Sequence, residues 1–157
     1  MTRVKEKNDT CYFMGYPCHL IHNIACHASE VFQKDCSVDI EDLCIDLYYW
    51  FDKSTKRKGI LAEFCDFCDN EYREIVRHVN VRWLSLEKAV NRILQVYPSL
   101  ESYFKSENES QARFGRLLTA MTEVCLLFYQ SDLPTFNNIN LLLQQYISSC
   151  QSYKRIS

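Results

Sequence analysis

The residues with the clearest capacity for chemistry are cysteines and histidines near the start of the chain. Thiol and imidazole side chains gather within a short stretch: Cys18, His19, His22, Cys26 and His27. At helical pitch Cys18, His22 and Cys26 share one face, and these are ligand types that zinc prefers. The pair that would complete four ligands, Cys65 and Cys68, lies about forty residues later, which matches no common zinc site. Packing on a helix is the favoured alternative, and we assign no metal or cofactor here.

A second chemical pattern is the C-x-x-C sequence Cys65-Asp66-Phe67-Cys68. A redox role requires a strand-to-helix context of the thioredoxin kind. Here both cysteines belong to an apolar helical stripe. Core packing is therefore the favoured interpretation.

A third pattern is the adjacent pair Arg82-Trp83 at the expected start of a helix. Guanidinium groups pair with phosphate and indoles stack on bases, so the pair suits a nucleic-acid contact, with Arg77 and His78 adding local positive charge. In the alternative, Trp83 anchors the helix on the core and Arg82 is a surface charge. Residue types favour this alternative, because the net charge of -2 gives no overall attraction to nucleic acid.

Carboxylates are plentiful but do not form a recognisable catalytic group. Asp39, Glu41, Asp42 and Asp46 fill the polar face of one amphipathic segment, which is typical of a solvated surface. The sequence has no nucleophile elbow, P-loop or dinucleotide fingerprint. We assign no catalytic residue and expect no small-molecule substrate.

Composition indicates the elements that must position these residues. The chain of 157 residues is 47% apolar and 13% aromatic, with three glycines and three prolines, which favours helices over short strands. We expect an all-α fold of six or seven amphipathic helices, with at most one short strand over residues 11–15. Residues 1–10 are expected to be a frayed start, and residues 11–157 a single domain.

Apolar periodicity places the helices and their boundaries. The expected apolar segments are 21–32, 40–51, 61–68, 86–97, 98–104, 114–128 and 139–150. Pro17 suits the first turn of the first helix, and Ser37 or Asp39 caps the second. Residues 53–58 are expected to form a basic link. Residues 131–134, which include Pro134, are expected to end the sixth helix.

The nine cysteines indicate the kind of cellular compartment in which the protein is expected. Their odd number, the absence of a signal peptide at the start and their positions on apolar helical faces favour a reduced, intracellular environment. No apolar run reaches the length of about 18 residues that a membrane helix needs, so a soluble protein without a membrane partner is expected.

The segment Arg82-Trp83-Leu84-Ser85-Leu86, with Cys18 and His19 upstream, resembles the hAT superfamily of DNA transposases and the host proteins derived from it, such as the zinc finger MYM-type and SCAN-associated relatives. In this family a helical insertion interrupts a ribonuclease H-like catalytic domain. A Cys-x-x-His motif opens the insertion and an Arg-Trp motif follows several helices later. The resemblance implies that residues 11–15 are the last core strand and that His19 is the motif histidine.

The chain departs from the family pattern in two places. The motif cysteine falls on Tyr16, so the first motif holds only if Cys18 replaces it, and Val81 stands where relatives usually carry threonine. The family's metal-binding aspartates and glutamate would lie before residue 11 and after residue 157. The resemblance therefore implies no catalytic residue in this sequence.

These observations lead to an expected function. We expect a catalytically inactive hAT transposase-derived fragment, nuclear by resemblance, that acts as a helical interaction or DNA-contacting module. DNA would be contacted locally by Arg82 and Trp83, and protein partners or a second copy by exposed apolar surface. The alternative is one piece of a longer hAT transposase with metal-dependent strand transfer activity.

Overall fold

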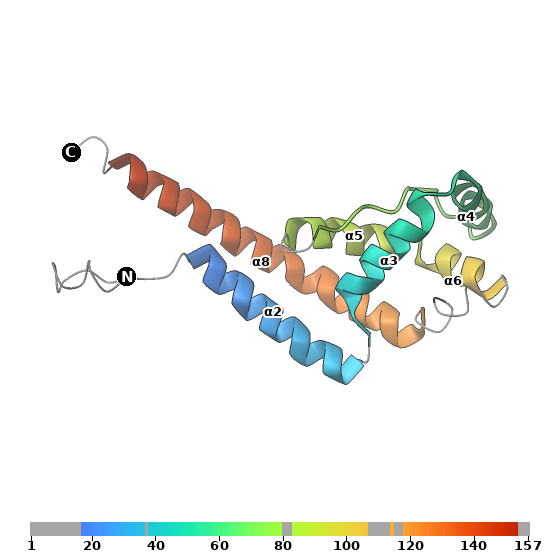
Figure 1. The fold of residues 1–157 in the computed structure, drawn as a ribbon, viewed down its shortest axis with the longest axis horizontal. Coiled ribbons are helices and arrows are strands. Elements are labelled where there is room, and N and C mark those ends of the chain that lie inside the picture. Colours follow the sequence, from blue (N-terminus) through green and yellow to red (C-terminus); the bar gives the residue numbers. More distant parts are fainter. Residues whose placement is uncertain (1–16, 37, 80–82, 107–113, 115–117, 154–157) are drawn as a thin grey trace.

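The computed structural model describes residues 17–36, 38–79, 83–106, 114 and 118–153, which form helices and connections without any strand (Figure 1). The helices are α2 (Pro17–Cys36), α3 (Ile40–Asp52), α4 (Thr55–Phe67), α5 (Trp83–Gln95), α6 (Tyr97–Ser106) and α8 (Ala120–Tyr153). The predicted all-α class is confirmed for these residues. The expected frayed start and strand lie in residues 1–15, outside the described part of the chain.

The start of α3 follows from local capping. Of the two candidate caps, Asp39 is the residue that precedes the helix, and its Oδ1 accepts a hydrogen bond of 3.0 Å from the Asp42 amide. This bond satisfies one of the amides that a helix start leaves without a partner. α2 likewise begins as predicted, with Pro17 in its first turn.

The basic link expected over residues 53–58 is wrong, because α4 begins at Thr55. Ser54 caps the helix by accepting a hydrogen bond from the Arg57 amide. The Arg57 guanidinium lies 3.7 Å from the centre of the Trp50 ring and donates to the Trp50 carbonyl oxygen at 3.0 Å. Capping and this cation–π contact therefore convert a polar, basic segment into the first turns of a helix.

The end of α4 is fixed by Asp69, whose φ of 57° lies in the left-handed region. Aspartate tolerates this conformation better than most residues. The chain reversal lets the Asn70 amide donate to the Cys65 carbonyl oxygen at 2.8 Å, which satisfies a carbonyl at the helix end. Residues 70–79 then run without helix or strand toward α5.

The prediction that residues 131–134 end a helix is wrong, because α8 continues through Pro134 for 34 residues. Contacts with α5 hold the helix on both sides of the proline. Gln130 donates to Asn91 Oδ1 at 2.7 Å, and Asn137 donates to Glu87 Oε2. These tertiary contacts outweigh the one backbone hydrogen bond that a proline removes. α8 therefore runs as one continuous rod from below α3 and α5 to the C-terminal end of the structure (Figure 1).

α8 also begins later than the apolar pattern predicts, at Ala120 rather than near Phe114. Thr119 precedes the helix and its Oγ1 accepts a hydrogen bond of 3.3 Å from the Thr122 amide. This is the geometry of a helix cap. The apolar residues Phe114 and Leu118 are buried ahead of the helix and still belong to the core.

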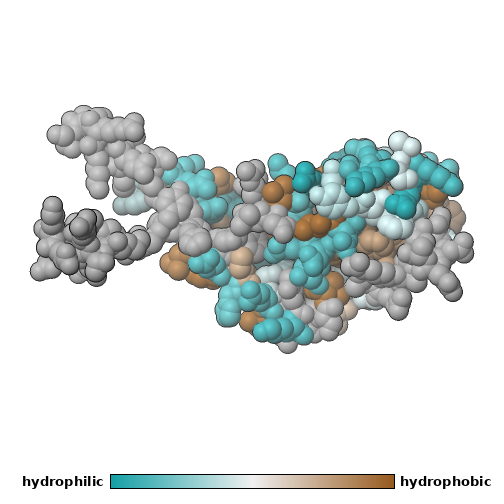
Figure 2. Space-filling model, viewed as in Figure 1, coloured by the Kyte–Doolittle hydropathy of each residue, from teal (hydrophilic) through white to brown (hydrophobic). Residues whose placement is uncertain are grey.

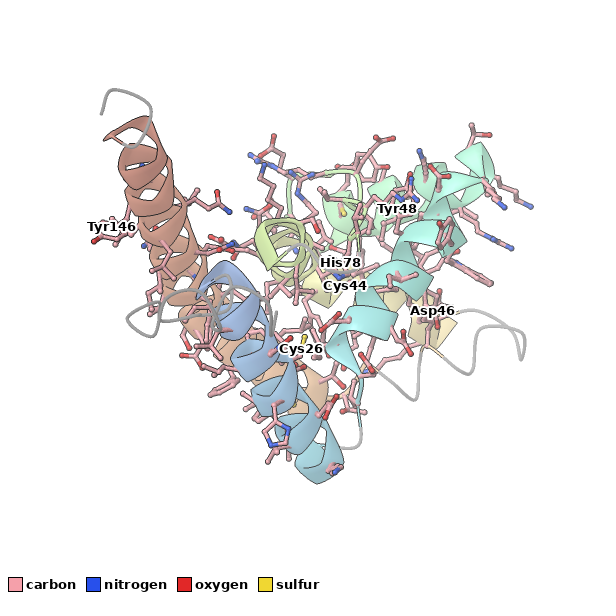
Figure 3. All side chains as sticks on the ribbon, turned by 60° about the vertical axis from the view of Figure 1, so that its left-hand side comes forward. Cys26, Cys44, Asp46, Tyr48, His78 and Tyr146 are labelled. Atoms are coloured by element: carbon pink, nitrogen blue, oxygen red, sulfur yellow. The ribbon has the colours of Figure 1, made fainter. Side chains whose placement is uncertain are left out.

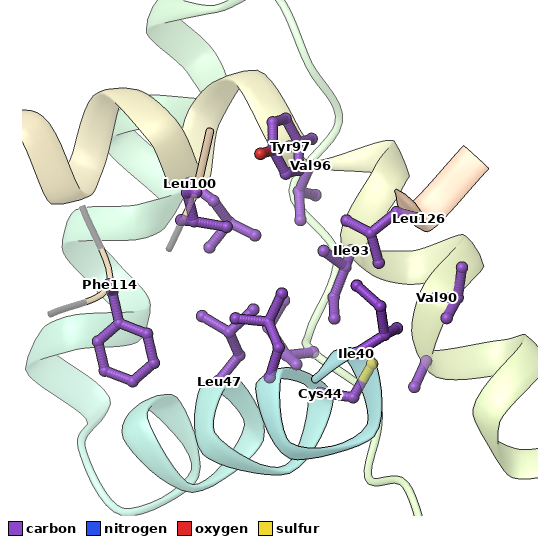
Figure 4. Packing of buried hydrophobic residues seen from close by; sticks show 14 of the residues in the cluster. Ile40, Cys44, Leu47, Val90, Ile93, Val96, Tyr97, Leu100, Phe114 and Leu126 are labelled. Atoms are coloured by element: carbon purple, nitrogen blue, oxygen red, sulfur yellow. The ribbon is translucent and has the colours of Figure 1, made fainter. Parts of the chain in front are cut away.

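The core lies where α3, α5, α6 and the first half of α8 meet (Figure 4). Fully buried aliphatic side chains come from all four helices: Ile40, Leu47, Val90, Ile93, Leu100 and Leu126. An aromatic cluster closes one end, with ring centres 4.8 to 6.1 Å apart among Trp50, Phe51, Tyr103, Phe104 and Phe114. α2 stands apart from this core and packs on α8.

Candidate functional site

The Arg-Trp pair is only partly placed by the structure. Arg82 lies outside the described residues, and α5 begins at Trp83, whose side chain is not described. The helix start predicted at this position is therefore confirmed, whereas the direct DNA contact stays a prediction. Arg77 is exposed close by in the chain, as a charged nucleic-acid contact would require.

His78 does not add surface charge as expected, because its side chain is buried at 2% exposure. Its Nδ1 lies 3.0 Å from Ser85 Oγ, and its Nε2 lies 3.6 Å from Glu41 Oε2 (Figure 3 labels His78 between α3 and α5). The residue thus connects the loop before α5 with two helices. Glu41, expected on a solvated face, forms the outer end of this connection.

The hydrogen bonds of Ser85 explain the arrangement. Its hydroxyl donates to the Val79 carbonyl oxygen at 3.2 Å and accepts from the Val79 amide at 3.1 Å. A hydroxyl has one proton to donate, so His78 Nδ1 must be the donor to Ser85 Oγ.

A serine, a histidine and a glutamate in a row suggest nucleophilic catalysis, but this geometry opposes it. The Ser85 hydroxyl donates to the Val79 carbonyl oxygen at 3.2 Å, so in this arrangement its proton is not held by the imidazole as a catalytic base would hold it. The histidine is also almost completely buried. The group is a structural clasp that fixes the start of α5.

The candidate zinc ligands are not brought together among the side chains that are described. Cys18, His19 and His22 lie in the first turns of α2, but their side chains are not described. His27 is exposed and lies 3.8 Å from Glu30, whereas Cys26 is half-buried and points toward α3 (Figure 3). Within the described part of the chain, no three histidine, cysteine or acidic side chains gather as a metal site would require.

Burial governs the chemistry of the cysteines. It raises the pKa of the Cys26 thiol, with smaller contributions from Glu41 and Glu30, and it raises the pKa of Cys65. Cys65 belongs to the core, which confirms the packing interpretation for this residue. Cys68 is half-buried and lies 3.7 Å from Ser102 Oγ. Because a raised pKa keeps thiols protonated, Cys26 and Cys65 are poorly suited to nucleophilic or redox chemistry.

The structure reveals an apolar groove between α2 and α8 that the sequence did not predict. The two helices run antiparallel and meet through a 2.5 Å hydrogen bond between Ser29 and Tyr129 and through stacked rings of Phe32 and Phe128, 4.4 Å apart. The groove has a volume of about 440 Å³, and among the described residues that line it only Asp132 is charged.

Apolar side chains extend from this groove along both helices. We call them together the α2–α8 face: Leu20, Ile24 and Val31 of α2 with Met121, Val124, Phe128, Ile139, Leu142 and Tyr146 of α8. Each is between 38% and 71% exposed. Figure 2 shows brown apolar side chains reaching the surface over α2 and α8, and Figure 3 shows Tyr146 projecting outward.

The clue to this face in the sequence is the charge content of α8. Its 34 residues include only two charged side chains, Glu123 and Asp132. Surface helices normally carry charges over the side that faces water. Apolar periodicity marks the side of a helix that faces its own core, but it does not distinguish that side from a second apolar side left open.

Comparisons with known proteins add no assignment: no protein-family model matches the sequence, and no curated protein or solved structure matches it significantly. None of the described helices combines the length and apolar character needed to cross a membrane.

Proposed function

We propose that this chain is a non-enzymatic helical interaction module and that the α2–α8 face is its binding surface. The observation that carries the proposal is the exposure of nine large apolar side chains on the two helices that form the groove, two of which, Val31 and Phe128, line it. Contiguous apolar patches, unlike single scattered apolar residues, are typical of interaction sites.

The shape of the groove suits an amphipathic helix. Two antiparallel helices leave a channel into which the ridge of a third helix can pack. Ala25 and Ala28 line the groove, and their small side chains permit a close approach. Because Asp132 is the one charge among the described lining residues, an apolar ridge would enter this part of the groove without burying several unpaired charges.

We further propose that the module derives from the helical insertion of an hAT transposase and has no catalytic activity of its own. The support is the Arg82-Trp83 sequence at the start of α5, the Cys18-His19 pair in the first turn of α2, and the wholly helical character of the described residues. Magnesium-dependent nuclease or strand transfer activity of the purified chain would contradict this proposal and favour the alternative, one piece of an active hAT transposase.

The binding function is tested with helical peptides. A displayed library of peptides with apolar residues at i, i+3, i+4 and i+7 is selected against the full chain, and the bound peptides are mapped by chemical shift changes. We expect the changes at Ala28, Phe128 and Phe136, and loss of binding in Phe128→Glu. Selected peptides that map elsewhere, or that bind Phe128→Glu equally well, would overturn the proposal.

A local nucleic-acid contact at the start of α5 is a second candidate. The specific observation is that α5 has no acidic residue in its first turn, so the positive end of the helix is not neutralised next to Arg82. Affinity for a single-stranded DNA oligonucleotide should fall with salt and fall about tenfold in Trp83→Ala, as one lost stacking contact predicts. Equal affinity of the variant would exclude the contact.

A further inference from the structure

The α8 part of the α2–α8 face forms one straight stripe. At 100° per residue its six members lie within a sector of about 60° on the helix surface. They are Met121, Val124, Phe128, Ile139, Leu142 and Tyr146. We call them the α8 stripe. It runs from the first turn of α8 into the half of the helix that extends beyond α5 (Figure 1).

The α8 stripe is nearly symmetric about its own centre. Met121 and Tyr146 are equally distant from the midpoint between Leu133 and Pro134, and so are Phe128 and Ile139; Val124 and Leu142 differ by one residue. A two-fold interface needs a patch that is complementary to itself, since residue i of one copy meets residue j of the other and the reverse. This spacing satisfies that requirement for two antiparallel helices.

We propose that the chain forms a two-fold symmetric dimer in which α8 packs antiparallel on α8 of a second copy along this stripe. The proposal rests on the function inferred above and names its partner. Phe128 would contact Ile139 of the partner subunit, and Met121 would contact Tyr146 of the partner subunit. With one α2 beside each α8, the dimer interface becomes a four-helix arrangement.

Charge favours a second copy over a charged partner. α8 has no basic residue, and of its two acidic ones only Asp132 lies near the stripe. Asp132 and Thr135 are equally distant from the midpoint, so antiparallel pairing sets each carboxylate opposite a hydroxyl instead of a like charge. A partner rich in lysine and arginine, or a nucleic acid, would find no matching charges along this helix.

The apolar surface is large enough for a specific dimer interface. The α8 stripe spans about 38 Å, and a helix contact about 10 Å wide over this length covers roughly 400 Å² on each copy. Val31 and Phe128 line the same groove, so the apolar residues of α2 lie beside the α8 stripe and add to the contact. The total then reaches the range of about 1,000 Å² that specific interfaces exceed.

The test is the oligomeric state of the full chain, measured by sedimentation equilibrium under reducing conditions. Leu142 lies on the stripe, whereas its neighbour Leu141 is also exposed but points to another side of the helix. We expect Leu142→Glu to raise the dimer dissociation constant about 30-fold or more and Leu141→Glu to leave it within a factor of about three. Equal weakening by both variants would overturn the stripe as the interface.

A charge-exchange pair tests the antiparallel register. Phe128→Lys and Ile139→Glu should each be monomeric, and mixing the two proteins should restore a heterodimer, because the new lysine faces the new glutamate in this register only. Circular dichroism checks that each variant is folded. A wild-type chain that remains monomeric at high concentration, or a mixture that fails to pair, overturns the dimer. Helical peptides that still map to the groove would then leave the interaction module intact.

Discussion

His78 Nδ1 lies 3.0 Å from Ser85 Oγ, and this contact joins the end of an irregular loop to the first turn of α5. The same hydroxyl bonds to both the amide and the carbonyl of Val79. The Ser85 side chain therefore ties Val79, which precedes the Arg-Trp sequence in the chain, to the first turn of α5, which follows it. Ser85 is the residue on which the position of the loop end depends most directly.

Replacing Ser85 by alanine should destabilise the fold by about 1 to 3 kcal/mol, because a buried imidazole nitrogen and a backbone amide lose their partner together. Urea unfolding followed by circular dichroism gives the free energy. Ser106→Ala is the matched control, since its exposed hydroxyl makes one hydrogen bond to the Tyr103 carbonyl oxygen. If the two variants lose the same free energy, the clasp is not a major support.

The contact between α2 and α8 should depend on the hydroxyl of Tyr129. Tyr129→Phe keeps the ring that packs beside Phe32 and removes the bond to Ser29, so we expect a loss of about 1 kcal/mol. Hydrogen exchange should rise over α2 more than over α5. Tyr49→Phe, at an exposed position on α3, should change neither measurement. Unchanged exchange in α2 would show that the aromatic stacking alone holds this helix.

Pro134 should reduce the stability of the helix that contains it. Alanine at this position restores an amide that can donate to the Gln130 carbonyl oxygen, so Pro134→Ala should stabilise the protein by about 1 to 3 kcal/mol. Thermal unfolding measures the gain. A loss of stability would mean instead that the packing of α8 on α5 and α2 requires the backbone geometry that proline fixes at this position.

The buried thiol of Cys44 should make stability fall at alkaline pH. Burial raises the pKa of this thiol, with smaller contributions from Glu41 and Asp39, so the folded state keeps a proton that the unfolded state releases. The contribution to stability is complete below the ordinary thiol pKa of about 8.5 and is lost as the pH rises toward the raised value.

Cys44→Ala removes this titration. Between about pH 9.5 and 10.5 the unfolding free energy of the wild type should fall more steeply, by about 1.4 kcal/mol per pH unit, than that of the variant. Urea unfolding at several pH values, with reductant present, provides both slopes. Parallel slopes would show that Cys44 ionises equally in the folded and unfolded states.

Much of the fold could be predicted from periodicity because most helices have one apolar side and an identifiable cap. One prediction failed because distant residues decide the outcome: α8 crosses Pro134 because Asn91 and Glu87 of α5 hold it on both sides, and no local pattern relates these residues. The other failed for a local reason: α4 begins early because Ser54 caps it and Arg57 contacts Trp50, seven residues earlier.

The candidate site was less predictable for the same reason. The sequence predicted His78 as a charge beside the Arg-Trp pair, but its side chain is buried, and Glu41 from a helix much earlier in the chain lies 3.6 Å from its Nε2. The groove forms only when residues near Phe32 meet residues near Phe128. The sequence shows that α8 carries few charges, but apolar periodicity alone does not show which side of the helix remains exposed.

The buried thiols of Cys44, Cys65 and Cys125 belong to three different helices, α3, α4 and α8. Each can react with a thiol reagent only when its own helix opens, so the labelling rate of each thiol reports the opening rate of one helix. Peptide mapping of the labelled cysteines would time the opening of the three helices separately, without introducing any probe.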